Sequence, residues 1–465
     1  MLNKLTFKGG SVANNLIPSI IGQEKMAEKL AIDGGAKAVN TIGPFPSKIG
    51  KEELLEVLDL WQMSPENTLK IRSIIENENN FKGPHLFRYY NPRPSKVAAA
   101  EKAMKDLIGT KYCMATNSCT SALVAAYRSL GIGMGDEVIV PAYTFFATSA
   151  TVVASNAIPV IADVDETLCL DPKSVEKAIT KRTKAIVPVH MRGAPAQMDA
   201  IIDVANKYGI PVIEDVAQAA GGSFKGKPLG SIGQIGCFSF DYYKVIVSGE
   251  GGFYTTNNER LHTRALNWHD CAACWRPDRF GPEKENEDLF CGENYRMSEL
   301  EGAVALAQIR KAGVIVSKHR AAKKKIKDAI QSFPGLSFRR LADEAGDVGI
   351  CLVIFLPDAE MTKKLLPALK AEGVPCGGIY DAKVRDWHTY NYWEHILQYK
   401  SVSNDKLPWS GVPQNELPKY KKDMCPRSLE LLSKAVLIDI DYNLSDDDCN
   451  KISTAINKVL SVYLK

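Results

Sequence analysis

The sequence lacks a large excess of charge of either sign. Its 465 residues include 58 Lys and Arg against 54 Asp and Glu, which leaves a formal net charge of only +4. Proteins that bind nucleic acid concentrate positive charge on one face. The densest basic run here, residues 320–327, has the pattern of a solvated helix face instead. We therefore expect no nucleic-acid partner.

Long apolar runs are also missing. No stretch approaches the roughly 18 consecutive apolar residues that a membrane-spanning helix needs, and the best candidates, such as residues 351–356, are short. The start of the chain, Met1-Leu-Asn-Lys-Leu5, does not resemble a secretory leader. We therefore expect a cytoplasmic protein that does not act at a membrane.

The cysteines give no sign of a disulfide framework or a zinc site. There are 11 of them, an odd number scattered along the chain, which is typical of reduced thiols in a cytoplasm. The single C-x-x-C motif, Cys271 to Cys274, has no second pair at zinc spacing. We expect no metal site.

Length and composition predict an ordered chain of more than one domain. Apolar residues make up 45% of the sequence and charged residues 24%, as in ordinary globular proteins. A large α/β enzyme of this size commonly folds as two lobes. We expect an N-terminal arm over residues 1–48, a large domain over 49–315 and a small domain over 316–465.

The large domain shows the rhythm of an α/β protein. Short apolar runs alternate with helical patterns, which indicates buried strands of a mostly parallel sheet. The chemistry of such sheets gathers at the carboxyl ends of the strands. The predicted strands include residues 138–140, 159–161, 185–189 and 211–213.

The last third of the chain has a different character. Residues 352–356 predict a strand, and Leu365 and Leu369 lie on the apolar face of a following helix. Ser445 is a good N-cap for a terminal helix. We therefore expect a smaller α+β lobe here.

Two predicted strand ends carry small hydroxyl or aromatic residues. Residues 115–121, Ala-Thr-Asn-Ser-Cys-Thr-Ser, come directly before a helix, where backbone N–H groups and the helix dipole favour an anion. The same residues also make an ordinary helix cap. Residues 141–148 place aromatic side chains after a strand, where they either stack on a flat ligand or fill the core.

Two charged residues stand at other strand ends. Asp215 closes the strand that begins at Pro211, and a buried carboxylate there needs a partner, either a structural one or a cationic ligand. Lys244 follows a predicted strand among aromatic residues, where it is either a nucleophile or a solvated loop residue.

The order of these features resembles the pattern of pyridoxal-phosphate enzymes with the aspartate-aminotransferase fold. More specifically, the chain from about residue 50 onward resembles the DegT/DnrJ/EryC1/StrS family of sugar aminotransferases. The resemblance implies fold type I, with a mostly parallel seven-stranded sheet in the large domain. The matching stretches are residues 133–145, 189–193, 214–219, 248–252 and 294–300.

The resemblance also implies roles for single residues. Lys244 matches the lysine that forms the Schiff base with pyridoxal 5′-phosphate, and Asp215 matches the partner of the pyridinium nitrogen. Phe145 matches the ring-stacking aromatic, and Gln218 matches the group near the phenolic oxygen. The phosphate-binding positions correspond to Thr120, Ser121, Ser239 and, from the neighbouring subunit of a homodimer with shared active sites, Asn294.

The sequence departs from the family pattern at two sites. Asp241-Tyr-Tyr-Lys244 replaces the usual His-Pro-Thr-Lys, and Ser118-Cys-Thr-Ser121 replaces Ser-Gly-Thr-Ala. A minority branch of the family performs 3-dehydration with His in place of the lysine, so Lys244 favours transamination.

The resemblance leaves the substrate open. Residues 30–39 resemble leaders of members that act on keto-cyclitols and aminoshikimate-type precursors. The members that form 8-amino-3,8-dideoxy-octulosonate are resembled instead by residues 165–170, 239–241 and 387–388. His269, Arg385 and His388 are candidates for lining a substrate pocket and equally for structural or surface positions.

These observations predict an aminotransferase that uses pyridoxal phosphate. It is expected to move an amino group from glutamate or glutamine onto a keto sugar, keto sugar acid or keto-cyclitol through Lys244. The alternatives are a pyridoxal-phosphate sugar dehydratase and a cofactor-binding regulator without turnover.

Overall fold

The computed structural model describes residues 29–39, 48–81, 86, 94–271, 290–381 and 383–464. Cys274 of the C-x-x-C motif lies outside these residues. The chain divides into two compact units, Met1–Pro84 and His85–Lys465. The boundaries expected at residues 48/49 and 315/316 stay predictions.

The first unit contains a pair of short helices, α1 (Lys51–Asp59) and α2 (Pro65–Glu76). Ser64 caps α2, since its hydroxyl accepts a hydrogen bond from the Asn67 amide, and proline occupies the first helical position. The Lys51 ammonium donates to the Glu76 carbonyl, 2.6 Å away, and so ties the start of α1 to the end of α2.

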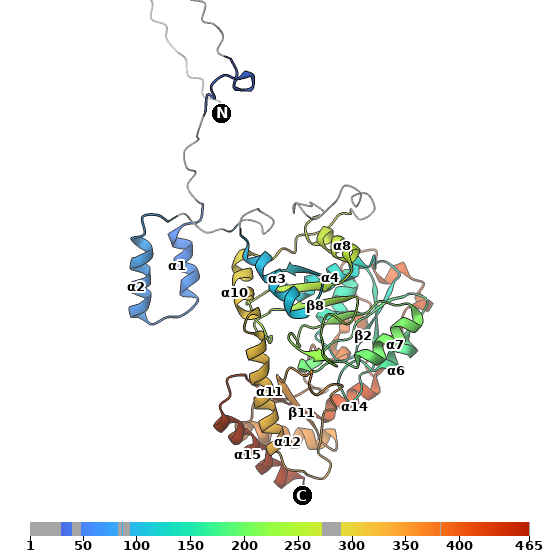
Figure 1. The fold of residues 1–465 in the computed structure, drawn as a ribbon. Coiled ribbons are helices and arrows are strands. Elements are labelled where there is room, and N and C mark those ends of the chain that lie inside the picture. The colour runs from blue at the N-terminus through green and yellow to red at the C-terminus, as the bar shows by residue number, and fades with distance from the viewer. Residues whose placement is uncertain are drawn as a thin grey trace, which may run out of the picture. The chain divides into compact units, whose positions relative to one another are not determined.

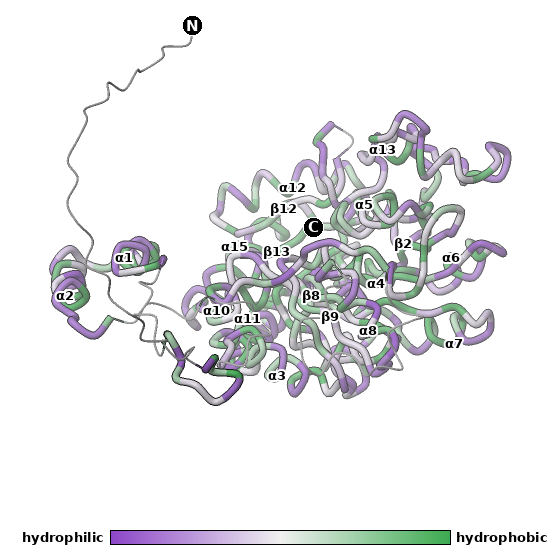
Figure 2. The backbone as a smooth tube through the Cα atoms, turned by 90° about the horizontal axis from the view of Figure 1, so that it is seen from above, coloured by the Kyte–Doolittle hydropathy of each residue, from purple (hydrophilic) through white to green (hydrophobic). Residues whose placement is uncertain are grey.

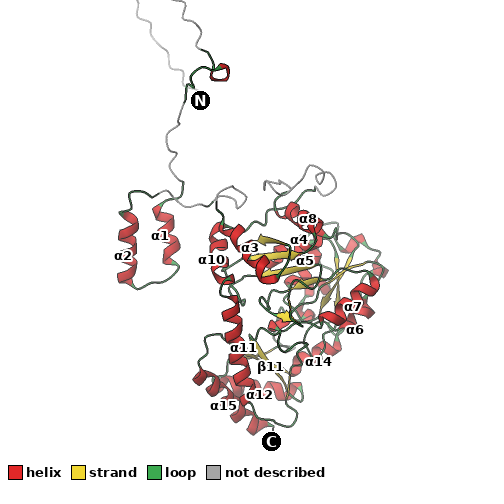
Figure 3. Ribbon diagram, viewed as in Figure 1, coloured by secondary structure: helices red, strands yellow, loops and turns green. Residues whose placement is uncertain are grey.

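The second unit is built on a sheet with helices on both faces (Figure 1, Figure 3). Within the described residues, four strands pair in the order β1-β9-β8-β5 and three in the order β3-β2-β4. Parallel bridges from Ile186 to Val212 and from Val189 to Asp215 join β4 to β5. The strands are β1 (Tyr112–Thr116), β2 (Glu137–Pro141), β3 (Ile158–Ala162), β4 (Thr183–Ile186), β5 (Ile213–Asp215), β8 (Ile235–Ser239) and β9 (Gly252–Thr256).

Joined in this way, the seven strands form one sheet in which only β9 runs against its neighbours. The predicted fold type I sheet, seven-stranded and mostly parallel, is thereby confirmed. A short hairpin, β6 (Ser223–Phe224) and β7 (Lys227–Pro228), lies outside it.

Helices bury the two faces of this sheet. The residues of β2, β8 and β9 are buried, as expected for strands covered on both sides. Figure 2 shows hydrophobic residues gathered inside the second unit and hydrophilic ones along many of its outer loops. The helices are α3 (Lys96–Ile108), α4 (Cys119–Ser129), α5 (Ala147–Ala154), α6 (Pro172–Ala178), α7 (Met198–Tyr208), α8 (Glu259–His269) and α10 (Glu299–Ile309).

A second sheet follows the long helix α11 (Ala312–Ala329). Its strand order, β10-β11-β13-β12, is antiparallel throughout. The predicted strand at 352–356 is β11, and Ser445 caps the last helix with a reciprocal hydrogen-bonded box to Asp448. The elements are β10 (Ser337–Phe338), β11 (Cys351–Phe355), β12 (Cys376–Gly378), β13 (Ala435–Asp439), α12 (Ala359–Ala371), α13 (Glu394–Leu397), α14 (Pro426–Lys434) and α15 (Asp446–Tyr463).

A connection between β12 and α13 returns to the first sheet. The Tyr390 amide donates to the Ala142 carbonyl at 3.0 Å, just beyond the end of β2. The Thr144 amide donates to the His388 carbonyl at 2.9 Å. His388, far along the chain, is thereby fixed beyond the carboxyl end of β2.

The described residues contain neither a membrane-spanning helix nor a group of side chains arranged to hold a metal ion. No helix among them is long and apolar enough to span a bilayer. No cluster of three or more His, Cys, Asp or Glu side chains there has an arrangement that could hold a metal ion.

Candidate active site

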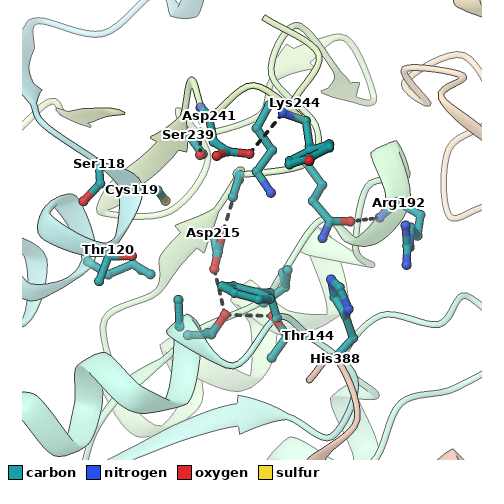
Figure 4. A pocket seen from close by; sticks show the side chains of 18 of the residues that line it. Ser118, Cys119, Thr120, Thr144, Arg192, Asp215, Ser239, Asp241, Lys244 and His388 are labelled. Atoms are coloured by element: carbon teal, nitrogen blue, oxygen red, sulfur yellow. Dashed lines mark hydrogen bonds between the residues drawn. The ribbon is translucent and has the colours of Figure 1, made fainter. Parts of the chain in front are cut away.

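A cavity of about 520 Å³ opens at the carboxyl ends of β2, β4 and β5, a size typical of small-molecule sites. Figure 4 shows Ser118, Cys119 and Thr120 on one side, Arg192 and His388 on the opposite side, and Asp215 and Lys244 between them. Further lining residues are Thr144, Phe145, Thr148, Val189, Gln218, Ser239, Asp241, Tyr243, Glu250 and Ile350.

One side of the cavity is the N-terminus of α4. Ser118 caps this helix by accepting a hydrogen bond from the Ser121 amide at 3.1 Å. Thr120 lines the cavity, as does Ser239 at the end of β8. Ser121 is buried beside them and does not line the cavity, because its hydroxyl donates to Asn117 at 2.6 Å. Hydroxyl groups and a helix N-terminus together suit an anion such as phosphate.

The turn before α4 packs tightly against the start of β9. A Cβ atom added to Gly252 would lie 2.4 Å from the Ser118 carbonyl carbon and 2.6 Å from the Cys119 amide nitrogen. Glycine at position 252 is therefore what lets β9 support the anion-binding turn. We call this turn, Ser118 to Thr120 supported by Gly252, the anion cradle. Any residue larger than glycine at position 252 would push the turn out of place.

Replacing Gly252 with alanine is expected to weaken binding of a phosphate-bearing ligand, because the added methyl must push the Ser118–Cys119 backbone away. Titration of the phosphate cofactor by absorbance measures the effect. Gly313→Ala is the matched control, since Gly313 lies in α11 with open space around its Cβ position and alanine favours a helix. Equal cofactor affinity in both variants would contradict the cradle.

Asp215 ends β5 at the floor of the cavity and is buried. Its carboxylate accepts hydrogen bonds from the Ala217 amide at 3.1 Å and from the Thr148 hydroxyl at 2.9 Å, and Thr148 in turn contacts Thr144. Burial raises the pKa of Asp215, and the hydrogen bonds and the positive charge of Lys244 offset that rise only in part. No described basic side chain forms an ion pair with this carboxylate, so a cationic ligand suits the position.

Lys244 lies in the loop between β8 and β9, where its amide donates to the Asp241 carbonyl at 3.0 Å. The Asp241 carboxylate accepts from the Tyr243 amide at 3.0 Å and tightens the turn. Tyr242 and Tyr243 are largely exposed. The loop thus directs the Lys244 side chain into the cavity toward Asp215 (Figure 4).

Phe145 and Gln218 reach the cavity from two other strand ends. The Phe145 ring is 48% exposed and its centroid lies 5.4 Å from that of His388, so one ring face is open to a ligand. Gln218 accepts a hydrogen bond from the Arg192 amide at 2.9 Å through its carbonyl oxygen. Its amide nitrogen, a donor, is left for the cavity.

Of the remaining predicted residues, some line the cavity and others do not. Of the three substrate-pocket candidates, only His388 lines the cavity; its ring contacts Asp386 at 2.8 Å. His269 is buried in α8, and Arg385 contacts Glu394 at the surface. Asn294 is exposed and does not line the cavity of its own chain.

Sequence reasoning missed several lining residues, among them Arg192. This residue adopts left-handed backbone angles, φ 54° and ψ 40°, which are uncommon outside glycine. Its Nε atom donates to the Tyr143 hydroxyl at 3.3 Å. The available signal was the matching stretch 189–193, in which Arg192 stands at a strand end.

The donor and acceptor set fits pyridoxal 5′-phosphate. The cavity offers a phosphate cradle, a buried carboxylate without a cation, an exposed aromatic face and an amine, all at the carboxyl ends of one sheet. Together with the seven-stranded sheet, these features define a pyridoxal-phosphate enzyme of fold type I.

Comparison with known proteins identifies the family. Residues 93–408 match the DegT/DnrJ/EryC1/StrS aminotransferase family. The chain therefore belongs to this family and is a pyridoxal-phosphate sugar aminotransferase, and its cofactor is pyridoxal 5′-phosphate.

Individual relatives agree with this assignment. An uncharacterized protein of Methanocaldococcus jannaschii is 36% identical over 90% of this chain and 97% of its own length. The L-glutamine:2-deoxy-scyllo-inosose aminotransferase of Streptoalloteichus tenebrarius is 42% identical over 43% of this chain and 49% of its own. The aminotransferase from Psychrobacter cryohalolentis has a similar structure, with a TM-score of 0.67 and 25% identity over 91% of this chain and 100% of that one.

Proposed function

We propose that the protein transfers an amino group from glutamine or glutamate to the carbonyl carbon of a keto sugar, keto sugar acid or keto-cyclitol, with Lys244 as its reacting amine. The observation that carries the proposal is the convergence of Lys244 and Asp215 in the cavity that also holds the anion cradle. The similarity to an enzyme named for L-glutamine and a keto-cyclitol supports the donor and the acceptor class.

The lining residues divide the work of holding the cofactor. Ser118, Thr120 and Ser239 would bind its phosphate, and the Asp215 carboxylate would pair with its ring nitrogen. The exposed face of Phe145 would stack on the ring, and the Gln218 amide nitrogen would donate to its phenolic oxygen. When bound, pyridoxal phosphate supplies an electron sink that stabilises a negative charge at the substrate carbon.

The chain's own groups then supply the proton movements. Lys244 would hold the cofactor's aldehyde carbon until the donor's amine displaces it. The freed Lys244 amine would carry a proton between the donor's Cα and C4′ of the cofactor, and in the reverse direction for the keto substrate. Asp215 would stay ionised opposite the ring nitrogen and keep that nitrogen protonated.

A homodimer with shared active sites completes the proposal. Asn294 is exposed, and the neighbouring Tyr295 carbonyl accepts a hydrogen bond from the Asn117 amide, next to the anion cradle. The family resemblance makes Asn294 a phosphate contact for the second subunit. Mixing two inactive variants, Lys244→Ala and Asn294→Ala, should then restore part of the activity.

The absorption spectrum of the cofactor-loaded protein tests the function. We expect a visible band that bleaches when glutamine or glutamate is added and returns when an amino-accepting keto sugar or keto-cyclitol follows. A band that ignores both donors, with product formed by loss of water instead, would establish the dehydratase in its place. A protein that binds the cofactor but changes neither donor nor ketone would be the regulator.

A further inference from the structure

Arg192 is held in a strained conformation at the edge of the cavity. Its left-handed backbone, φ 54°, is followed by Gly193 at φ 83°. A Cβ atom on Gly193 would lie 2.8 Å from the Ile350 side chain, and the Gly193 carbonyl accepts from the Val348 amide at 3.0 Å. Packing against the 348–350 segment therefore fixes this turn. Strain that the surroundings maintain in this way is typical of functional sites.

Two hydrogen bonds hold Arg192 in this turn, one from its backbone amide and one from its side chain. Its amide faces the Gln218 side chain at 2.9 Å, and its Nε atom faces the buried Tyr143 hydroxyl at 3.3 Å. The first contact holds the backbone of the turn, and the second holds the Nε side of the guanidinium group. Figure 4 shows Arg192 on the side of the cavity opposite Ser118 and Thr120.

The guanidinium group nevertheless has no anionic partner. Among the described residues, no carboxylate forms an ion pair with Arg192, and no acceptor contacts Nη1 or Nη2. The carboxylates of Asp386 and Asp439 interact with the Arg192 charge at longer range, and the hydrogen bonds to the Asp386 carboxylate come from His388. A partly buried, always-charged group whose one side-chain partner is a neutral hydroxyl is incompletely compensated.

From this geometry we infer that Arg192 binds a substrate carboxylate by a two-pronged contact through its Nη atoms. The inference rests on the proposed transamination and names a feature of its substrates. The carboxylate comes from the amino donor, from a keto sugar acid as the acceptor, or from each in turn. The shape of guanidinium suits a carboxylate held by two parallel hydrogen bonds.

The first test measures binding alone. Glutarate, a dicarboxylate without an amine, is titrated calorimetrically into the cofactor-loaded protein. Arg192→Asn should weaken its binding roughly 10- to 100-fold, while Arg427→Asn, which removes an exposed arginine of α14, should bind as the wild type does. Asparagine tolerates the left-handed backbone, so the fold is retained. Glutarate that does not bind the wild type, or binds Arg192→Asn equally well, would overturn the inference.

The second test identifies the source of the carboxylate. A donor contact raises KM for glutamine in Arg192→Asn but leaves the rate with glutaminol, which lacks the carboxylate, unchanged. An acceptor contact raises KM for a keto sugar acid but not for 2-deoxy-scyllo-inosose, which has none. Unchanged KM values for all carboxylate-bearing substrates would overturn the inference. A wild type without transamination would refute the proposed function instead, and the glutarate result would still decide the role of Arg192.

Discussion

Replacing Lys244 with alanine is expected to lower turnover by about 10³-fold, the scale of losing a positioned acid–base group. Among the described residues that line the cavity, Lys244 carries the one aliphatic amine. In the proposed function, alanine removes the group that attaches the cofactor and also the group that moves the proton. The cofactor-loaded variant should lack the visible band of the wild type, which absorbance detects before any activity is measured.

Two further variants separate chemistry from charge. Lys244→Arg keeps a positive charge opposite Asp215, but guanidinium does not lose its proton near neutral pH, so this variant should be as inactive as Lys244→Ala. Lys225→Ala removes an exposed lysine that pairs with Asp199 outside the cavity, and its activity should match the wild type. Activity near the wild-type level in Lys244→Ala would contradict the proposed role of the residue.

The apolar runs predicted the fold well because each overlaps a strand whose residues are largely buried. The run at 138–140 lies inside β2, Glu137–Pro141. Only the last residue of the run at 211–213 lies in β5, which extends to Asp215 because Glu214 and Asp215 pair with Gly236 and Cys237 of β8. Strand β9 has few aliphatic residues, and its pairing with β1 and β8, which local sequence does not reveal, makes it a strand.

In the site too, local sequence predicted some residues, whereas the placement of others depends on contacts between distant segments. Thr120, Phe145, Asp215, Gln218, Ser239 and Lys244 all line the cavity, as expected for residues that follow parallel strands; their roles remain proposals. Arg192 was not foreseen, because packing of Gly193 against Ile350 determines its backbone. The placement of His388 likewise depends on a hydrogen bond from the Thr144 amide to its carbonyl, and these two residues lie far apart in the sequence.

Asp215→Asn is expected to weaken cofactor binding while leaving the cofactor-free protein at least as stable as the wild type. Loss of a charged partner from a buried pair costs about 3–5 kcal/mol, or roughly 10²- to 10⁴-fold in affinity. Asparagine keeps the local contacts, because its oxygen can accept from the Ala217 amide and its nitrogen can donate to the Thr148 hydroxyl. Turnover should also fall, because asparagine has no charge to keep the ring nitrogen of the cofactor protonated.

The stability of the cofactor-free protein should depend on pH in a definite direction. Burial raises the pKa of Asp215 in the folded state, so the folded protein holds this proton more tightly than the unfolded chain does. Stability from this group is therefore largest at low pH and is lost as the pH rises from about 4 through the raised folded value. The Asp215→Asn variant does not lose stability in this way, because asparagine does not titrate. Its advantage over the wild type should be smallest in acid and should grow toward neutral pH.

Thermal unfolding of the two proteins without cofactor, followed between acid and neutral pH, tests this difference. Asp199→Asn is the matched control, since it removes an exposed carboxylate that pairs with Lys225 and should change neither cofactor affinity nor turnover. A cofactor-free Asp215→Asn protein that is less stable than the wild type at neutral pH would mean that the carboxylate supports the fold. The opposite result, together with weak cofactor binding, would mean that Asp215 is kept at a cost to stability because its charge serves the cofactor.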